Sequence, residues 1–350
     1  MATPTGPERR LLAAGYRKAA AWDTALALGA GFGLNCKSIS GFIRSQDYLK
    51  ADEIDLAMVK GGSLDVVKPI EPTVATDMLY DSGALGIAIA QFFGIAGAPA
   101  QQGGTTAYKH IIQLADSGWN KFGTMAVELP GQIWECPSIK PIEWSLKSVN
   151  GGFVVSEMKL RGNVIKNDSS VNTLTQMDAL TYQDRDNRVL FRQQAIRMNT
   201  QAGVTLEGTG VIDPTSVEIS MKRTGHDSVY PAGQYGIVEP AEGGFPDFRV
   251  KLGWPRFDAV NGAHFAAAIA ETTQKMTITF TGLLIASTYY YQLKFYFPRL
   301  RMMVPEPSFD EIVKNGVELI AEEASAAPTG MSYARPYIEM INLRATDYLA

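Results

Sequence analysis

Three histidines, His110, His226 and His264, are the residues of this 350-residue chain that are best suited to metal binding or proton transfer. Histidine ligands of a zinc site usually recur within a few residues, as in HExxH, and none of the three belongs to such a group. His110 falls in a predicted strand, His264 on a predicted helix and His226 in a loop that contains Gly and Asp. We therefore expect structural or surface histidines, and no metal site is predicted.

A glycine cluster at residues 29–33 (GAGFG, Gly29 to Gly33) is similar to a loop that cradles a phosphate, with Asp52 near the distance of a ribose-binding acid. Such a loop needs a strand before it and a helix after it. No β-branched strand precedes the cluster, and residues 34–37 do not open a good helix. A nucleotide cofactor is therefore not expected.

Two pairs of acids are candidates for general acid and base chemistry, Glu322 with Glu323 and Asp184 with Asp186. Two catalytic carboxylates must face one cleft, and nothing in the sequence indicates that either pair does, so loop or surface positions are expected. No serine lies in a GxSxG elbow. No catalytic residue, metal ligand or cofactor is predicted, and the chain is not expected to be an enzyme.

Composition is typical of a folded protein, with 46% apolar and 19% charged residues, and the net charge of -4 argues against a nucleic-acid-binding surface. Cys36 and Cys136 fit neither a metal site nor a disulfide framework, which indicates a reducing compartment with both thiols acting as small apolar side chains. The longest apolar run, residues 83–98, is too short for a membrane span and predicts a core helix. Residues 1–22 do not look like a secretory signal.

Aromatic side chains gather at residues 289–297 (YYYQLKFYF). A sugar-stacking platform and a girdle strand of an outer-membrane barrel are two alternatives, and the second also requires an export signal. We prefer a strand that is buried on one face and covered by a neighbouring subunit on the other. A rival is a carbohydrate-binding or carbohydrate-cleaving β-sandwich that stacks sugars on Trp119, Trp134 or Trp254.

A hairpin over residues 142–165 is the strongest structural signal of the chain. Asn150-Gly151-Gly152 tolerates the positive φ angles of a tight turn. Apolar and polar residues alternate on both sides of the turn, which predicts two strands with one buried and one polar face. The predicted buried face holds Ile142, Trp144, Leu146, Val154, Met158, Leu160 and Val164, and the polar face holds Glu143, Ser145, Lys147, Glu157, Lys159 and Arg161.

Further strands and two helices are predicted around this hairpin. One helix spans residues 81–93, begins at Asp81-Ser82 and covers the hairpin; the other spans 258–272 and has Phe265, Ala268 and Ile269 on its apolar side. Strands are predicted at 36–44, 62–69, 106–115, 122–129, 188–198, 216–223, 247–252, 276–281 and 289–297, and 308–324 with 336–343 as a strand pair. Residues 167–187 read as a long polar loop.

The order strand, helix and then strands occurs twice, which predicts a structural duplication. We expect a mainly-β fold of two similar β-sandwiches or rolled sheets, each with one packed helix, over residues 61–200 and 201–350, after an N-terminal arm of residues 1–60. The arm and the loop 167–187 are candidate contacts between subunits or between rings. Long amphipathic hairpins leave open edges, which a ring of copies would close.

Four segments of the chain follow one another in a familiar order: DSGALGIAIAQFFGIAG (81–97) with TTAYKHIIQLAD (105–116), then CPSIKPIEWSLKSVNGGFVVSEMKLRGN (136–163), then VLFRQQAIRMNTQAG (189–203) leading to SVEISMKR (216–223). This order of a helix, a hairpin and later strands resembles that of the major tail tube proteins of long-tailed bacteriophages. The likeness covers most of residues 60–345 in pattern.

The resemblance implies a structural virion protein without enzymatic activity, made in the host cytoplasm and located in the virion tail. Its rings would stack into a hollow tube, with three copies per ring if both halves are tube domains and six if only one is. The implied partners are other copies of itself, tail terminator, tail tip and tape measure proteins, and DNA passing without sequence-specific binding; no membrane partner is implied. The lumen is expected to be net acidic and lined by the hairpin 142–165 and a counterpart within 275–300 or 308–343. A tail terminator or capsid decoration protein is the alternative within the virion.

Overall fold

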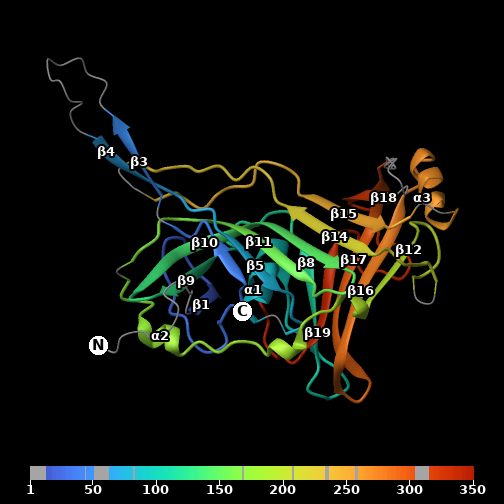
Figure 1. The fold of residues 1–350 in the computed structure, drawn as a ribbon, viewed down its shortest axis with the longest axis horizontal. Helices are drawn as coiled ribbons and strands as arrows, with labels where there is room; N and C mark the ends of the chain where they lie inside the picture. Colours follow the sequence, from blue (N-terminus) through green and yellow to red (C-terminus); the bar gives the residue numbers. More distant parts are fainter. Residues whose placement is uncertain are drawn as a thin grey trace.

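The computed structural model describes residues 13–43, 45–50, 63–81, 83–167, 169–206, 209–232, 236–256, 259–303 and 315–350. Most of its regular structure is antiparallel β-strand (Figure 1), which confirms the predicted mainly-β class. The first elements are β1 (Ala13–Lys18), β2 (Ser38–Ser40), β3 (Ser45–Lys50), β4 (Ser63–Lys68), β5 (Thr73–Asp77), α1 (Gly83–Phe93), β6 (Gly94–Ala96), β7 (Ala100–Gln101), β8 (Tyr108–Leu114), β9 (Gly123–Leu129), β10 (Gln132–Val149) and β11 (Val155–Gly162).

The later elements begin with three short helices and end with two neighbouring long strands and their partners. They are α2 (Leu174–Asp178), η1 (Arg185–Asn187), η2 (Phe191–Gln193), β12 (Gln194–Thr200), β13 (Val211–Ile212), β14 (Ser216–Lys222), β15 (Asp247–Trp254), α3 (Ala259–Ile269), β16 (Gln274–Ala286), β17 (Tyr289–Met302), β18 (Asn315–Glu322) and β19 (Tyr337–Asn342).

One four-stranded unit occurs twice in the main sheet. The first unit has the order β2-β5-β11-β10 and the second has the order β14-β15-β18-β17. β10 of the first unit pairs with β14 of the second, so the two units form one sheet. In each unit the long strand also reaches a second layer: β10 pairs with β9, which pairs with β1, and β17 pairs with β16, which pairs with β12.

The corresponding elements of the two units follow one another along the chain in the same order. β1, β2, β5, α1, β9, β10 and β11 correspond to β12, β14, β15, α3, β16, β17 and β18. The agreement extends to single hydrogen bonds at the start of β2 and β14. Lys37 N–H donates to Ala75 O at 2.8 Å, and Thr215 N–H donates to Gly253 O at 2.8 Å; each acceptor residue is paired in the ladder with the residue that follows the donor. The order of elements that suggested a duplication is therefore repeated in the pairing of the strands.

Two separate domains in tandem are not confirmed, because the units share one sheet and their limits differ from the predicted ones. β1 belongs to the first unit although it lies in the predicted arm of residues 1–60, and buried Tyr16 on this strand is part of the core. β12 begins at Gln194, before the predicted boundary at residues 200 and 201, yet it pairs with β16 of the second unit. β8, from the first half of the chain, pairs with β19 near the C-terminus.

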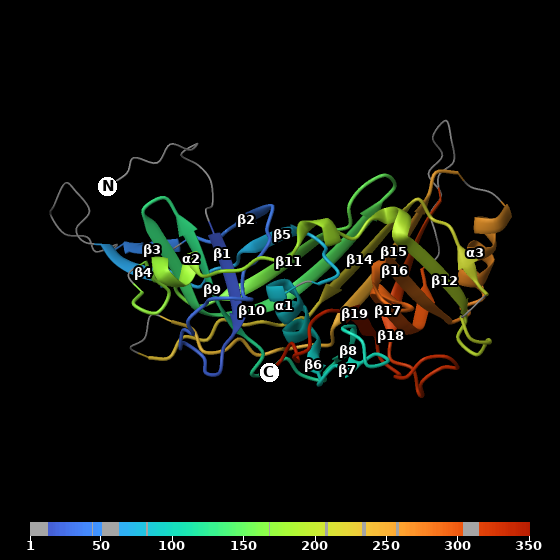
Figure 2. The ribbon, with the colours of Figure 1, turned by 90° about the horizontal axis from the view of Figure 1, so that it is seen from below.

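The helix α1 lies in the middle of the molecule between the two layers (Figures 1 and 2). All of its side chains are buried, which confirms the predicted core helix. Phe93 packs edge-on against Trp144 of β10 with ring centroids 6.1 Å apart, and Phe92 stacks on Phe248 of β15 at 6.1 Å. The predicted helix over the hairpin is thus confirmed, and the same helix also contacts the second unit.

The corresponding helix α3 lies at the end of the molecule farthest from the β3–β4 ribbon (Figure 2). It is shorter than the predicted 258–272, and only part of the predicted apolar face is correct: Ala268 is buried, whereas Ile269 is 61% exposed. The side chain of Phe265 lies outside the described residues.

The predicted hairpin 142–165 is present, with Gly151 at a φ of 77° in its turn, but its limits are different. β10 begins at Gln132, ten residues earlier than predicted. The strand can continue through Pro137 and Pro141 because both lie where the register of the ladder shifts, so that the N–H group that proline lacks is not needed for pairing there. β11 ends at Gly162, so Val164, predicted to be buried within a strand, lies beyond it and is only partly buried.

Three other predictions need correction. The strands predicted within 308–324 and 336–343 exist as β18 and β19, but they do not pair with each other: β18 lies between β15 and β17, and β19 lies between β17 and β8. Residues 308–314 lie outside the described part of the chain. The strand predicted at 188–198 begins only at Gln194, after η2. The predicted loop 167–187 contains α2 and η1, and its Met177 and Leu180 pack in a small core cluster with Leu28 of the same chain.

Candidate functional surface

The outer face of the joined sheet carries an ordered set of charges. Side chains on β11, β10, β14, β15 and β18 alternate, so that apolar residues such as Trp144, Ile219 and Val250 face the core and polar residues face outward. The predicted polar face of the hairpin is confirmed in this respect. It forms one end of a broader surface that crosses the join between the two units.

Charges of opposite sign alternate across the strands of this surface in two rows. One row runs Lys159, Glu143, Lys222 and Asp247, and the other runs Lys147, Glu218, Lys251 and Glu318, each residue being paired in the ladder with the next. The Nζ atom of Lys222 lies 3.1 Å from Glu143 Oε1, and Lys251 Nζ lies 3.8 Å from Glu318 Oε2. Arg249 sits between the rows and binds Glu318 at 2.9 Å. We call these two rows and Arg249 the charged face.

A repeated spacing in the sequence produces this alternation. Three consecutive strands of the sheet each carry an acid and, four residues later on the same face, a lysine: Glu143 with Lys147, Glu218 with Lys222, and Asp247 with Lys251. Because neighbouring strands are antiparallel, the acid of one strand lies opposite the base of the next. The spacing was available in the sequence, and strand pairing was needed to interpret it.

The charges of each row cancel, since each row holds two lysines and two acids. This face therefore does not show the net negative charge that the resemblance implies for a lumen. Each lysine or arginine on it has a carboxylate as a neighbour, and these partly exposed pairs each contribute little to stability. Their effect is to balance the potential of the surface.

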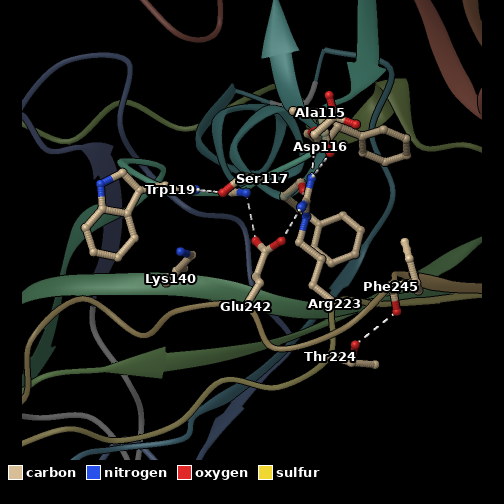
Figure 3. A network of polar contacts seen from close by, with 12 residues as sticks. Ala115, Asp116, Ser117, Trp119, Lys140, Arg223, Thr224, Glu242 and Phe245 are labelled. Carbon is tan, nitrogen blue, oxygen red and sulfur yellow. Dashed lines mark hydrogen bonds and ion pairs between the residues drawn. The ribbon is translucent and has the colours of Figure 1, made fainter.

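A buried arginine fastens the connection between β14 and β15 to the first unit (Figure 3). Arg223 directly follows β14, and its guanidinium donates to the carbonyl oxygens of Phe92 and Phe93 at the end of α1, at 2.5 and 2.8 Å. The same group binds Glu242 of the connection at 2.8 Å, and Glu242 accepts the Gly118 N–H at 2.8 Å. A cation at a helix C-terminus interacts favourably with its unpaired carbonyl groups. Burial lowers the pKa of Arg223, and the carboxylate of Glu242 opposes this change.

A second buried pair holds the same connection nearby. Lys140 of β10 donates to Glu239 Oε1 at 2.9 Å and to Pro240 O at 3.1 Å, and both charged side chains are almost fully buried. Glu239 also accepts the Asn120 N–H at 2.8 Å. Removing one partner of such a pair leaves an uncompensated buried charge, which destabilises a protein strongly. The described residues of the connection between β14 and β15 are therefore tied to the first unit by two buried ion pairs, and we call these pairs the clamp.

His226 lies beside the clamp and is 8% exposed. Neither ring nitrogen has a hydrogen-bond partner, and the backbone carbonyl of His226 accepts from Arg161. Burial, helped by the charges of Lys140, Arg161 and Arg223 and opposed by Glu242, lowers the pKa of His226 to about 4. The imidazole is therefore neutral at neutral pH, and a proton on it would enter a site that already holds three cations.

The joined sheet has an open edge at β2, the outermost strand of the first unit. Within the described residues, β2 pairs with β5 on one side only. The next two strands, β3 and β4, have no described partner strand other than each other, and this ribbon projects from the body of the molecule (Figure 1). An open edge and an isolated two-stranded ribbon are both unstable features in water, and natural proteins usually cover them.

The two remaining histidines pack against other side chains of the chain. His110 on β8 is buried, shares a hydrogen bond of 2.9 Å with Arg344 O and packs against the ring of Tyr348; burial lowers its pKa. His264 on α3 stacks on Trp254 with ring centroids 5.3 Å apart. No cluster of three possible metal-binding side chains occurs in the described part of the chain.

The glycine cluster and the two acid pairs do not come together in one site. Gly33 forms a bridge to Gly15 of β1, and the described residues after the cluster lead to β2 and to no helix, so the nucleotide-loop geometry is absent there. Asp52 lies outside the described residues. Glu322 binds Arg299 and Arg301, whereas Glu323 binds Arg335. The Asp184 carboxylate accepts the Asp186 N–H in η1, which explains this pair as a local turn.

The three tryptophans considered for sugar binding lie apart from one another. Trp119 is half-exposed beside Lys140, Trp134 lines a groove with Phe42 and Tyr182, and Trp254 stacks on the helix α3. In the aromatic strand, now part of β17, Tyr291, Leu293, Phe295 and Phe297 face the core, as predicted, whereas Tyr289, predicted on the same face, is only partly buried. The opposite face is partly covered by the chain itself, because Tyr296 stacks on Tyr337 of β19 with centroids 4.2 Å apart.

Both cysteines are free thiols. Burial raises the pKa of Cys136 to about 12 and also raises the pKa of Cys36, which fits small apolar side chains better than reactive ones. Among the described residues, no helix combines the length and the apolar character that crossing a membrane requires. In comparisons with known proteins, no family model matches this chain and no curated protein matches its sequence.

Proposed function

We propose that this chain is the structural subunit of a tail tube of the kind found in long-tailed bacteriophages. The observation that carries the proposal is the joined sheet: two equivalent amphipathic units lie side by side, and the sheet is open at β2. An open sheet with one polar and one apolar face is completed when further copies continue it around a ring. A lateral contact that closes gives a ring, and an axial contact that does not close gives a tube.

Two units per chain favour a ring of three chains, in which six equivalent units surround the lumen. Within each chain the two units are already paired side by side in one sheet, which is the arrangement that neighbouring units of such a ring would have. A ring of six chains would contain twelve units.

In this arrangement the charged face lines the channel and the second layer faces outward. DNA and the tape measure protein pass through the lumen, and tail terminator and tail tip proteins close the ends. The protein acts in the virion tail after synthesis in the host cytoplasm. The role needs no catalytic residue and no cofactor.

Negative-stain microscopy combined with size-exclusion chromatography and light scattering tests this proposal on the full chain. Rings or tubes with a central channel, and a soluble species of three chains, are expected. Single compact particles at millimolar concentration would refute the proposal and would favour a sandwich that functions alone.

A further inference from the structure

A polar pocket with a volume of about 390 Å³ lies on the second layer of the second unit. Its floor is the face of β12, β16 and β17 that points away from the core, and its walls come from the connection after β12 and the connection between β18 and β19. Its hydrogen-bonding and charged side chains include Arg197, Thr277, Thr279 and Lys294 on the floor and Thr205 and Thr329 on the walls. No acidic side chain is among the described residues that line it.

The first unit offers an internal comparison, because β1, β9 and β10 correspond to β12, β16 and β17. A shift in the ladder fixes the alignment of these strands. Between β9 and β10 the shift follows the pair Met125–Cys136, and between β16 and β17 it follows the pair Met276–Phe297. Both shifts skip one residue on the earlier strand and two on the later strand, so Met125 and Met276 occupy equivalent positions.

The place equivalent to the pocket is apolar and filled by the chain itself in the first unit. The positions of Arg197, Thr277 and Lys294 are taken there by Gly15, Ala126 and Ile133. Leu28 and Leu180 pack on this surface, and a Cβ atom at Gly15 would lie only 2.8 Å from Leu28 Cδ1 and 3.0 Å from Leu180 Cδ2. These two leucines belong to the connections after β1 and after β11, which correspond to the two walls of the pocket. The second unit therefore has a polar pocket where the first has a small apolar core.

A buried lysine fixes the walls of the pocket to its floor. Lys275 lies on the same face of β16 as Thr277 and is fully buried. Its ammonium group donates to Gly203 O at 2.7 Å and to Thr329 O at 3.0 Å, so it joins both wall connections to β16. The pocket is therefore built from fixed elements on three sides.

The side chains of the pocket suit an anion that also carries hydroxyl groups. The guanidinium of Arg197 donates to Thr209 O at 3.1 Å, and among the described residues no carboxylate binds it. Glu339, the ladder neighbour of Lys294, is bound by Lys109 at 3.1 Å and by the Tyr296 hydroxyl at 2.9 Å. A guanidinium binds carboxylates and phosphates through paired hydrogen bonds, and threonine hydroxyls both donate to and accept from the hydroxyls of a ligand.

We propose that this pocket binds a small anionic sugar, a sugar phosphate or a sugar carboxylate, with Arg197 on the anionic group and the threonine hydroxyls on the sugar. The volume falls within the range of about 300–1,000 Å³ that is usual for small-molecule sites. The inference does not depend on the proposed function. It is compatible with it, since the second layer faces outward in the proposed ring.

Isothermal titration calorimetry of the full chain tests the inference. Glucose 6-phosphate and glucuronate are the two anionic probes, and glucose and inorganic phosphate are the comparisons. At least one sugar anion should bind at one site per chain with a Kd of about 1 mM or tighter, and both comparisons should bind at least about tenfold more weakly. The stronger of the two anions identifies phosphate or carboxylate as the preferred group. No saturable binding of either sugar anion, or equal affinity for inorganic phosphate, would overturn the inference.

Two arginine variants locate the binding. Arg197→Gln should raise the Kd of the sugar anion at least about tenfold, because it removes the cation of the pocket floor. Arg185→Gln makes the same change in net charge at an exposed position of the first unit and should change the Kd by less than about twofold. Unchanged binding by Arg197→Gln, or an equal loss in both variants, would contradict the assignment to this pocket.

A threonine variant tests the role of the hydroxyls separately. Thr277→Val with Thr279→Val removes two hydroxyl groups from the floor and keeps the shape of the side chains. It should raise the Kd of the sugar anion at least about fivefold and leave the weak binding of inorganic phosphate unchanged. Full affinity for the sugar anion in this variant would contradict the proposed contacts to the sugar. If the variant does not fold, the comparison of the sugar anion with inorganic phosphate on the original chain decides.

Discussion

Acidification should weaken this protein, and His226 should contribute much of the effect. Its ring is buried without a hydrogen-bond partner, and the charges of Lys140, Arg161 and Arg223 disfavour a proton on it, whereas the charge of Glu242 favours one. In the folded state burial holds the pKa of this imidazole at about 4, below the ordinary value of about 6.5 that applies in the unfolded chain. A histidine with a depressed pKa gives its full stability above pH 6.5, and this stability is lost as the pH falls from 6.5 towards 4.

The size of the effect follows from proton linkage. Between pH 7 and pH 5 the unfolded chain takes up a proton on His226 almost completely, and the folded chain takes up very little. The free energy of unfolding should therefore fall by about 2 kcal/mol over this range from His226 alone, and by about 3 kcal/mol at pH 4. Burial also lowers the pKa values of His110 and His264, and these residues add to the loss in the same direction.

Urea denaturation at pH 7, 6 and 5 measures the effect, with His226→Leu as the comparison. The variant keeps His110 and His264, so the difference between the two pH profiles isolates His226. We expect the variant to lose about 2 kcal/mol less than the original chain between pH 7 and pH 5. Equal losses in both proteins, or an imidazole that titrates near pH 6.5 by NMR, would refute the placement of His226 in a closed, cation-rich site.

Three further predictions concern the clamp, the thiols and the charged face. Arg223→Met should lower the free energy of unfolding by about 3–5 kcal/mol, because the buried Glu242 loses its cation and the carbonyls of Phe92 and Phe93 lose the guanidinium donor, whereas Arg335→Met at an exposed pair should change it by less than about 1 kcal/mol; equal effects in denaturant titrations would contradict the clamp. Cys136, whose pKa burial raises to about 12, should resist iodoacetamide at pH 8 in the folded chain and react in urea, and rapid labelling of the folded chain would contradict its burial. Glu143→Gln with Glu318→Gln should raise the affinity for duplex DNA at least about tenfold at 50 mM salt, since their lysine and arginine neighbours lose their carboxylates. The control Asp186→Asn with Asp213→Asn makes the same change in net charge away from this face, and an equal gain in its affinity would show that net charge alone is responsible.

The sequence was sufficient for the elements whose signals are local. Alternation around Asn150-Gly151-Gly152 located the central hairpin, and the apolar run from residue 83 located the core helix. The first half of β10 was missed because Pro137 and Pro141 suppress a strand signal, although both lie at breaks in the ladder. Local patterns therefore identified strands better than they identified where the strands begin.

Pairing partners were not predictable, because alternation shows which face of a strand is buried and not which strand lies beside it. Thus β18 and β19 were expected to pair with each other and instead lie on different stretches of β17. The clamp was missed for a related reason: Arg223 follows a strand and reads as a surface residue until the fold brings it to the end of α1. The charged face had a usable signal, the acid and lysine four residues apart in three strands, whose meaning depended on antiparallel order.

A cryo-electron microscopy reconstruction of the assembled full chain, viewed along its axis, tests the central claim most directly. The account predicts six equivalent four-stranded units around a channel, contributed by three chains, with Glu143 and Lys222 on the channel wall. A ring whose channel is lined by the second layer around β9 and β16, or a chain that never associates, would contradict it.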